Sequence, residues 1–365
     1  MAADIAPSRL QGRDIDPPST KTYTIYLSKI SVAMKLRVPH HCLTGIASDA
    51  PENEGFEGGK DLLADVIDGH SKFRLSLPGG PTDNDKVLQH AEMEVKVIRL
   101  FFPTIHISKI CVCMAAWLAT LCHIDDVLEE MDSNRAVSIL FEFMDVIRYG
   151  GSPPCDAALD IERKNVLLTG QRFREHCSRY LLESEITPFL GKIYNVIEGL
   201  QREMCLRQSF LPSDLSTYLA IRTRTIGVAP FFALIERTEL PPNCLDLISD
   251  IQNDINLITG LQNDLIGLEK DIENGEMMSA INFVGDGIPI YKKGSEIGDI
   301  TEAVSHIYSI HNQAVFRAID KFKQLSEIAG PHASSALDVA RAQLTLAETH
   351  LKWCTSSKRY QAQVQ

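Results

Sequence analysis

A dense group of carboxylates follows an apolar stretch in the first half of the chain. Asp125, Asp126 and Glu129 come directly after residues 110–122, which are almost entirely apolar. On a helix, Asp125 and Glu129 lie one turn apart on one face, so their like charges repel. A hard divalent cation such as Mg²⁺ prefers several oxygen ligands and would offset this repulsion. The spacing therefore indicates a divalent-metal site, with a solvated acidic helix end as the alternative.

A second polar ladder lies further along the chain. Asn263, Gly267 and Asp271 stand at positions i, i+4 and i+8, which places them in one line along a helix. Amide and carboxylate oxygens in such a line can hold Mg²⁺ from one side while phosphate oxygens complete its shell. Lys270 stands beside the ladder, where its ammonium group can pair with phosphate. Leucine and isoleucine on the other faces favour a ladder that faces a cavity over an exposed polar face.

These two segments resemble the metal-binding motifs of class I terpene synthases. Asp125-Asp126-x-x-Glu129 is similar to the aspartate-rich first motif. Asn263 and Asp271 match the ends of the second motif, (Asn/Asp)-Asp-x-x-(Ser/Thr)-x-x-x-(Glu/Asp). The chain departs from that motif at Gly267, where the family usually has a metal-binding hydroxyl, and its Asp271 is shorter than the commoner Glu. We expect a water molecule in place of the hydroxyl, with some loss of metal affinity.

A third segment, Arg222-Thr-Arg-Thr-Ile226-Gly227, resembles the diphosphate-sensing helix of the same family. Gly227 and Pro230 disrupt regular helical hydrogen bonding and leave carbonyl oxygens free to point into a pocket. The resemblance implies that Arg222 is the diphosphate sensor. It also implies that Ile226 occupies the effector position. In the family, the helix break next to this position aims backbone carbonyl dipoles at the cation.

A fourth segment, near the C-terminus, is similar to the closing motif of the family. Trp353 is followed by Ser357, Arg359 and Tyr360 at the spacing Trp-x-x-x-Ser-x-Arg-Tyr. The resemblance implies that Arg359 donates bidentate hydrogen bonds to a diphosphate and that Tyr360 adds a hydroxyl, together with Arg222 and Lys270. An ordinary polar tail is the alternative.

An apolar wall is the remaining requirement for such chemistry. Ionisation of an allylic diphosphate leaves a carbocation that water would convert to an alcohol, so the site must be dry. Aromatic faces attract cations by about 0.5–2 kcal/mol each. The candidates for the wall are Phe101, Phe102, Trp117, Phe231 and Trp353. We favour Trp117, about two helical turns before Asp125, and Phe231, with simple core packing as the alternative for each.

The resemblance covers residues 85–361 and implies a terpene cyclase most like the sesquiterpene synthases of fungi. Such an enzyme holds three Mg²⁺ ions, for which Mn²⁺ can substitute, and an isoprenoid diphosphate. Farnesyl diphosphate is the expected substrate and a sesquiterpene hydrocarbon or alcohol the product, with geranylgeranyl diphosphate and a diterpene second. A chain-elongating prenyl diphosphate synthase is the nearest alternative, although it normally carries two Asp-Asp-x-x-Asp motifs. A catalytically silent helical scaffold is the non-enzyme alternative.

The elements that must position these residues are helices. Apolar residues recur at three- and four-residue spacing over 85–101, 104–130, 132–149, 155–175, 179–206, 212–238, 243–274, 299–328 and 332–354. Strand signals are nearly absent, although the pattern of residues 21–41 fits either a helix or an extended segment. The sequence thus predicts an all-α protein, a single class I terpenoid synthase bundle around a central active-site cavity.

The predicted organisation has three parts. Residues 1–20 form a disordered leader, residues 21–84 pack on the bundle, and residues 85–361 form the catalytic domain. Residues 285–298 contain four glycines and one proline, which is typical of a mobile lid.

Composition limits the partners. A formal charge of −12 argues against nucleic acid, because phosphate backbones bind clustered Lys and Arg. The apolar stretch 110–122 is shorter than a membrane span, so we expect a buried helix and no membrane anchor. The nine cysteines contain no CxxC pair, which favours reduced thiols in a cytoplasmic protein. A homodimer remains open.

Overall fold

The computed structural model describes residues 19–40, 57–80, 83–129, 131–151, 160–208, 214–236, 240–284, 297–329, 334–356 and 363–364. Three of the sequence predictions lie outside these ranges in whole or in large part. They are the leader up to residue 18, the lid over residues 285–296, and the motif residues Ser357, Arg359 and Tyr360.

Helices make up most of the described chain. The first group is α1 (Glu57–Ser76), α2 (Asn84–Phe101), α3 (Ser108–Glu129), α4 (Ser133–Tyr149), α5 (Ile161–Cys177) and α6 (Glu183–Gln208). The second group is α7 (Leu215–Thr225), α8 (Ala229–Ile235), α9 (Pro242–Asn274), α10 (Ile297–Ala329) and α11 (Ser334–Ser356), with a short 3₁₀ helix η1 (Ala280–Phe283) after α9. The all-α class predicted from the sequence is confirmed.

Local sequence explains where many of these helices begin and end. The side chain of Asp83 accepts a hydrogen bond from the backbone of α2, and Asp132 does the same for α4, which satisfies amide groups that have no partner inside the helix. Gly150 and Gly275 end α4 and α9 in the left-handed conformation that glycine adopts without strain. Element bounds therefore follow the predicted ones within a few residues over most of the chain.

The N-terminal segment forms strands, one of the two alternatives that the sequence pattern left open for residues 21–41. Strands β1 (Ser19–Leu27) and β2 (Val32–His40) form an antiparallel hairpin, and the short β3 (Gln363–Val364) pairs with the other edge of β1. Along β2 the side chains alternate between buried and exposed from Val32 to Val38, a half-buried strand pattern. For residues 21–41 the sequence pattern fitted either a helix or an extended segment, and the structure has the extended one. The turn at residues 28–31 carries none of the usual hairpin dipeptides, so the pattern gave no hairpin signal there.

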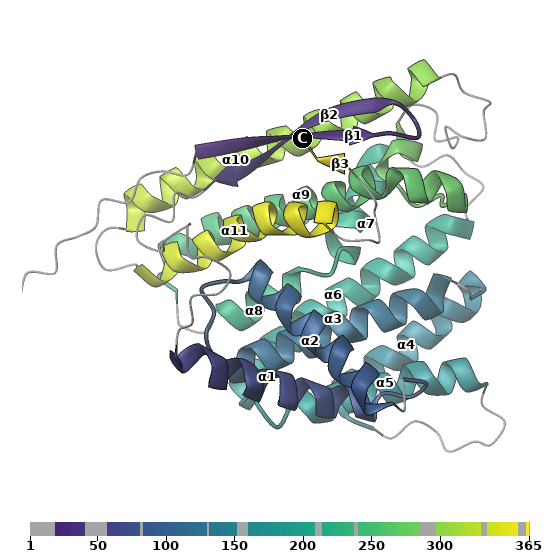
Figure 1. Ribbon diagram of the computed structural model, residues 1–365, viewed down its shortest axis with the longest axis vertical. Coiled ribbons are helices and arrows are strands. Elements are labelled where there is room, and N and C mark those ends of the chain that lie inside the picture. The colour runs from purple at the N-terminus through teal and green to yellow at the C-terminus, as the bar shows by residue number, and fades with distance from the viewer. Residues whose placement is uncertain are drawn as a thin grey trace, which may run out of the picture.

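The hairpin covers the outer side of α10 and α11 (Figure 1). Its inward-facing residues form a second hydrophobic core with α9, α10 and η1. Asn312 of α10 fixes the register, since its side chain accepts a hydrogen bond from the Arg37 amide at 2.8 Å and donates one to the Lys35 carbonyl at 2.9 Å. The sheet therefore stiffens the side of the bundle to which α9 and α11 belong.

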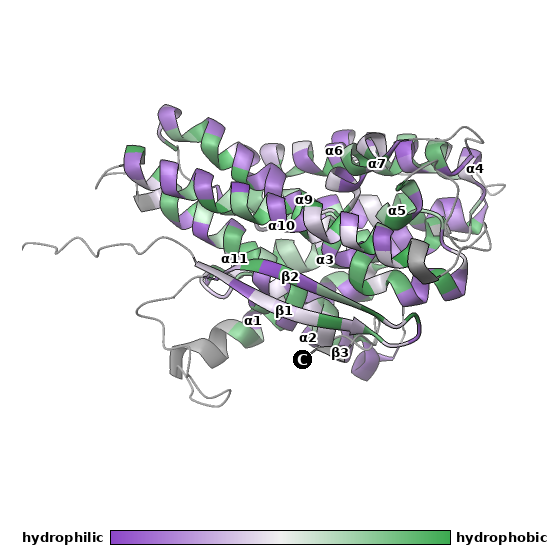
Figure 2. Ribbon diagram, turned by 90° about the horizontal axis from the view of Figure 1, so that it is seen from above, coloured by the Kyte–Doolittle hydropathy of each residue, from purple (hydrophilic) through white to green (hydrophobic). Residues whose placement is uncertain are grey.

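Helix α3 lies inside the larger core. Its residues from Ile110 to Ala119 are buried except Leu118, and they pack against α1, α2, α5 and α8. The helices show bands of hydrophobic and hydrophilic residues along their length, as amphipathic helices around a shared core do (Figure 2). Among the described residues, Ser108–Leu128 of α3 is long and apolar enough to cross a membrane, and so is the bent pair of α7 and α8 if the two count as one span. In α3, however, 61% of the most apolar 18-residue stretch is buried inside the bundle.

Candidate active site

A cavity of about 170 Å³ opens between α3, α6, α7, α9 and α11. Its lining combines charged side chains with apolar ones, and the charged ones come mainly from α6, α7 and α9. Leu118, Leu121 and Leu200 contribute to the apolar part. A cavity of this kind, with a few convergent charged groups in an apolar surrounding, is typical of a small-molecule site.

The two predicted metal helices meet at this cavity. Asp125 reaches it from α3, and Asn263 and Asp271 reach it from α9. Asp126 is exposed and does not line the cavity, since its side chain leaves α3 about 100° around the helix axis from that of Asp125. Gly267 is buried within α9 and supplies no side chain to the cavity. Only part of the predicted ligand set is therefore brought together.

Glu129 ends α3, and its side chain lies outside what the structure describes. Within the described residues, no group of three or more His, Cys, Asp and Glu side chains is gathered closely enough to hold a metal by itself. That finding suits a site in which carboxylates from two helices face each other across a cavity, because close contact between them would be repulsive without cations.

The carboxylate of Asp271 fits a cation. Burial, together with the negative charges of Asp264 and Glu276, raises the pKa of Asp271 to about 7, although Arg222 and Lys270 act in the opposite direction. The positive charges around Asp271 are therefore too few to stabilise its ionised form at neutral pH, and a bound cation would stabilise it. Its oxygens, with those of Asp125 and the Asn263 amide, are the hard donors that Mg²⁺ prefers. The residues present thus fit a divalent metal.

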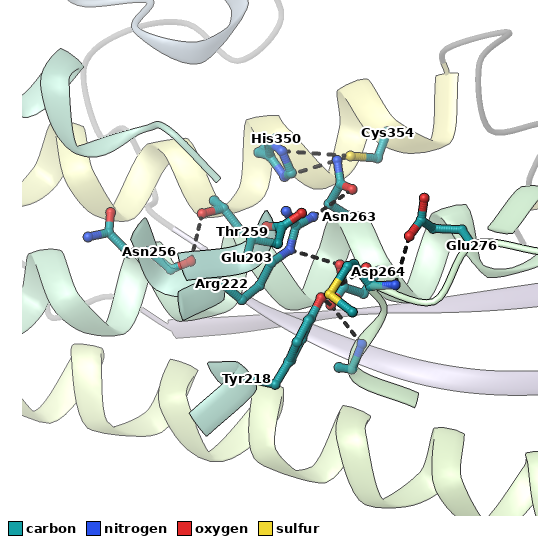
Figure 3. A network of polar contacts seen from close by, with 12 residues as sticks. Glu203, Tyr218, Arg222, Asn256, Thr259, Asn263, Asp264, Glu276, His350 and Cys354 are labelled. Atoms are coloured by element: carbon teal, nitrogen blue, oxygen red, sulfur yellow. Dashed lines mark hydrogen bonds and ion pairs between the residues drawn. The ribbon is translucent and has the colours of Figure 1, made fainter. Parts of the chain in front are cut away.

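Arg222 lies at the centre of the polar part (Figure 3). Its Nη2 donates a hydrogen bond to Asn263 Oδ1 at 2.8 Å, and its Nε lies 2.9 Å from Asp264 Oδ1 in an ion pair. Burial by itself would lower the pKa of Arg222, but Asp264, Tyr218, Glu203 and Asp125 together outweigh it and hold the pKa above its usual value. Arg222 is therefore a fixed positive charge next to the predicted metal ligand Asn263.

Asp264 holds several elements together, a role that the sequence prediction missed. The hydroxyl of Tyr218 on α7 donates to Asp264 Oδ2 at 2.7 Å, and the amide of Ala280 donates to the same oxygen at 3.1 Å. The Tyr218 ring stacks on Phe283 of η1 with centroids 4.5 Å apart. One buried carboxylate therefore joins α7, α9 and η1 around Arg222, and its only sequence signal was its place beside Asn263.

Two further cations line the cavity. Lys270 does so as predicted, and Arg207 of α6 does so without having been predicted. The Nη2 of Arg207 lies 3.3 Å from Glu276 Oε1 and 3.5 Å from Glu203 Oε1, and both carboxylates also line the cavity. No motif marked Arg207, because its nearness to Glu276 depends on how α6 lies against the end of α9.

The helix predicted over residues 212–238 breaks where the sequence indicated. Helices α7 and α8 meet at an angle of 46° around Gly227, which has a φ of +71°. A Cβ atom there would lie 2.3 Å from Leu121 Cδ2, so both conformation and space require glycine. Ile226, beside the break, lines the cavity as predicted.

Trp117 has a different place from the predicted one. It is fully buried, does not line the cavity, and donates a hydrogen bond from its indole Nε1 to the Gly227 carbonyl at 2.8 Å. An indole N–H buried in a core needs an acceptor, and the interrupted helix provides one. Trp117 therefore supports the helix break from behind, and the Gly227 carbonyl is engaged by it.

The other aromatic candidates divide between the cavity and the core behind it. Phe231, Phe101 and Trp353 line the cavity. Phe102 is 1% exposed and packs behind Phe231, with ring centroids 5.6 Å apart. His350 also lines the cavity and was not predicted, since a single histidine in an apolar helix is usually a core residue.

The geometry agrees with comparisons to known proteins. The family model described as terpene synthase family 2, C-terminal metal binding, matches residues 116–317. No curated protein matches the chain by sequence. Among solved structures, linalool/nerolidol synthase from Streptomyces clavuligerus, in complex with 2-fluorogeranyl diphosphate, has a TM-score of 0.57 at 16% identity, over 81% of this chain and 95% of that one.

Two more solved structures are similar to the same extent. Hedycaryol synthase in complex with nerolidol has a TM-score of 0.57 at 14% identity, over 81% of this chain and 93% of that one. A single-residue variant of cucumene synthase has a TM-score of 0.57 at 16% identity, over 81% and 96%. These likenesses show the fold, and they do not support a special affinity with fungal members. Because the family match spans more than half of the 365 residues, the chain belongs to terpene synthase family 2, as a class I terpene synthase that acts on a prenyl diphosphate with divalent metal.

Proposed function

We propose that this protein is a cyclase that ionises farnesyl diphosphate with Mg²⁺ and converts the resulting carbocation to a sesquiterpene. One observation carries the proposal. Asp125 from α3, and Asn263 and Asp271 from α9, line one cavity together with Arg222 and Lys270, while much of the remaining lining is apolar. A site that combines anion binding with an apolar chamber suits a substrate with a diphosphate head and a hydrocarbon chain.

The polar residues would take the diphosphate. Bound Mg²⁺, three ions by resemblance, would supply positive charge to the leaving group. Asp125, Asn263 and Asp271 would hold the metal, and water would replace the hydroxyl that Gly267 lacks. Arg222 and Lys270 supply fixed positive charge, since preorganised charge in a site that excludes water stabilises a leaving group more than it would in solution. By the motif resemblance, Arg359 and Tyr360 would complete the shell.

The apolar residues would hold the chain and keep water away. Phe231 is 2% exposed and lines the cavity beside Ile226, so the two can shape the folded substrate. The rings of Phe231 and Trp353 can attract the cation by about 0.5–2 kcal/mol each. Trp117 acts indirectly, since its hydrogen bond fixes the Gly227 carbonyl and so the geometry of the break next to Ile226.

Two similar structures bear on the chain length of the substrate, and the one with nerolidol supports farnesyl diphosphate. Hedycaryol synthase binds nerolidol in its structure, and linalool/nerolidol synthase binds a geranyl diphosphate analogue. Nerolidol has the carbon skeleton of farnesol, which favours farnesyl diphosphate. Geranylgeranyl diphosphate is the second candidate.

Product analysis tests the proposal. Purified protein is incubated with Mg²⁺ and geranyl, farnesyl or geranylgeranyl diphosphate, with and without isopentenyl diphosphate, and the products are separated by gas chromatography with mass spectrometry. We expect a cyclic sesquiterpene from farnesyl diphosphate alone. A longer diphosphate made only with isopentenyl diphosphate would identify a chain-elongating synthase instead, and absence of any product together with no binding of Mg²⁺ and diphosphate would indicate a silent scaffold.

Paired substitutions test the site itself. Asp125→Asn removes one charge inside the cavity, and Asp126→Asn removes the same charge from the exposed neighbour. Mutating a residue that only hydrogen-bonds to a metal ligand typically lowers metal affinity or activity by about 10–100-fold. Loss of a direct ligand should therefore lower kcat/KM by about 100-fold or more. The Asp126 variant should lose much less. Equal losses in the two variants would contradict the placement of the metal.

A further inference from the structure

His350 is a polar residue among the aromatic side chains that line the cavity. It is 3% exposed, lines the cavity from α11, and lies with its ring centroid 5.8 Å from those of both Phe101 and Trp353. His350 therefore brings a polar ring to a part of the cavity wall that two aromatic rings also form.

The tautomer of His350 is fixed by its neighbour Gln262. The amide nitrogen of Gln262 donates to the Ala347 carbonyl at 2.9 Å, which assigns the amide orientation and leaves Gln262 Oε1 as an acceptor. That oxygen lies 2.8 Å from His350 Nδ1, so Nδ1 must carry the hydrogen. The other ring nitrogen, Nε2, then keeps its lone pair.

The same network continues away from the cavity and is consistent throughout. The Gln262 amide nitrogen lies 3.3 Å from His311 Nε2, and His311 Nδ1 lies 3.1 Å from Asn312 Oδ1, the oxygen that also accepts from the β2 backbone. Every donor in this series meets an acceptor. Among the described residues, the hydrogen-bond contact of His350 Nε2 is a weak one with the Cys354 thiol at 3.8 Å, and the same sulfur lies 3.7 Å from Nδ1.

His350 is neutral in this environment. Burial, with the positive charge of Arg222 as a second cause, lowers its pKa to about 3. The lone pair is therefore available at neutral pH. A weak base suffices for a carbocation, because the hydrogens on carbons next to a cationic centre are among the most acidic in organic chemistry.

The carboxylates that line the cavity are less suited to accept such a proton, and Asp264 among them is paired with Arg222. Asp125 and Asp271 are proposed to hold metal, and Glu203 and Glu276 pair with Arg207. Each of these groups belongs to the charged part of the cavity, where the diphosphate would lie.

We propose that His350 is the base that ends the reaction by removing a proton from the cyclised carbocation. The C–H bond next to the cationic carbon breaks, its electron pair forms a carbon–carbon double bond, and the proton forms a new bond to His350 Nε2. The imidazolium then returns its proton to the released diphosphate or to solvent. The product is an olefin. This inference rests on the proposed cyclase function.

Product ratios in variants test the role. His350→Phe removes the base and keeps an aromatic ring, and His350→Gln keeps a hydrogen-bonding side chain without a basic nitrogen. Products are counted per diphosphate released, so that a general loss of activity does not affect the ratio. We expect the share of the wild-type olefin to fall by about tenfold or more in both variants, in favour of alcohols or olefins with a different double bond.

His311→Gln is the matched control, because it alters the same network outside the cavity and leaves the Gln262 amide held by Ala347. It should keep the wild-type ratio. The proposal is overturned if both His350 variants keep that ratio, or if the wild-type products are alcohols alone. Failure to release diphosphate from any substrate would instead refute the cyclase function, and this inference with it.

A measurement on the wild-type chain covers the case in which the variants do not fold. Nitrogen NMR of protein labelled with ¹⁵N-histidine distinguishes the two tautomers. His311 and His350 should both show a protonated Nδ1 and an unprotonated Nε2, and the signal that remains in His311→Gln belongs to His350. We expect the Nε2 signal of His350 to change when an apolar diphosphate analogue binds with Mg²⁺. A protonated Nε2, or a signal that does not respond to the analogue, would refute the proposal.

Discussion

Replacing Asp264 by Asn should destabilise the protein strongly. Asp264 is 2% exposed, and its oxygens meet the Arg222 guanidinium, the Tyr218 hydroxyl and the Ala280 amide. Asn has nearly the same shape, so the substitution removes the charge and leaves little empty space. Arg222, whose side chain is 15% exposed, would then lose the carboxylate that compensates its charge.

The magnitude follows from these contacts. Removing one partner of a buried ion pair costs about 3–5 kcal/mol, because the remaining charge stays buried without compensation. The Asn carbonyl can still accept one of the other hydrogen bonds, so we expect the lower part of this range, about 3 kcal/mol. Urea unfolding of the metal-free protein, followed by circular dichroism, measures the free energy of unfolding.

A double-mutant cycle separates the pair from its surroundings. Arg222→Met removes the charge that Asp264 compensates, so the double variant should be more stable than the sum of the single effects predicts, by about 1–3 kcal/mol. Glu175→Gln is the matched control, since Glu175 pairs with Arg172 on the surface at 2.9 Å and should matter by less than about 1 kcal/mol. A loss below about 1 kcal/mol for Asp264→Asn, or additive effects in the cycle, would refute this account.

Three other predictions concern backbone conformation and pH. Gly227→Ala should lower the free energy of unfolding by at least about 1–2 kcal/mol because of the positive φ, and the clash with Leu121 adds to this loss. The melting temperature should fall, and an unchanged melting temperature would contradict the need for glycine. Burial lowers the pKa of His311 to about 4, so the unfolded state binds a proton that the folded state excludes, and the free energy of unfolding falls as pH drops below about 6.5. Between pH 7.5 and pH 5.5, urea unfolding should show that His311→Gln loses about 1.3 kcal/mol less stability than the wild type. Equal losses would count against a neutral His311. Burial raises the pKa of Asp271 to about 7, so Mg²⁺ must displace a proton to bind this carboxylate below that pH. Calorimetry with diphosphate should show that the affinity for Mg²⁺ falls by up to about tenfold per pH unit below pH 7. Equal affinity for Mg²⁺ at pH 6 and pH 8 would exclude Asp271 as a ligand.

The sequence alone was enough for the helices and for the helix break. Apolar spacing of three and four residues is set by the helix itself, so α2, α4 and α9 begin and end close to their predicted bounds. Gly227 and Pro230 act on their own backbone, so the break between α7 and α8 could also be predicted. The motif resemblance singled out Asp125, Asn263 and Asp271, and the structure has all three in the lining of one cavity.

Only the tertiary structure decided which side chains share the site. Asp126 turns to solvent and Trp117 turns to the Gly227 carbonyl, although both stand near Asp125 in the sequence. Asp264 and His350 acquire their roles from partners on other helices. The physical reason is that periodicity and capping are local to one segment, whereas burial, pKa and hydrogen-bond partners depend on how distant helices pack, and no pattern within a single helix encodes that.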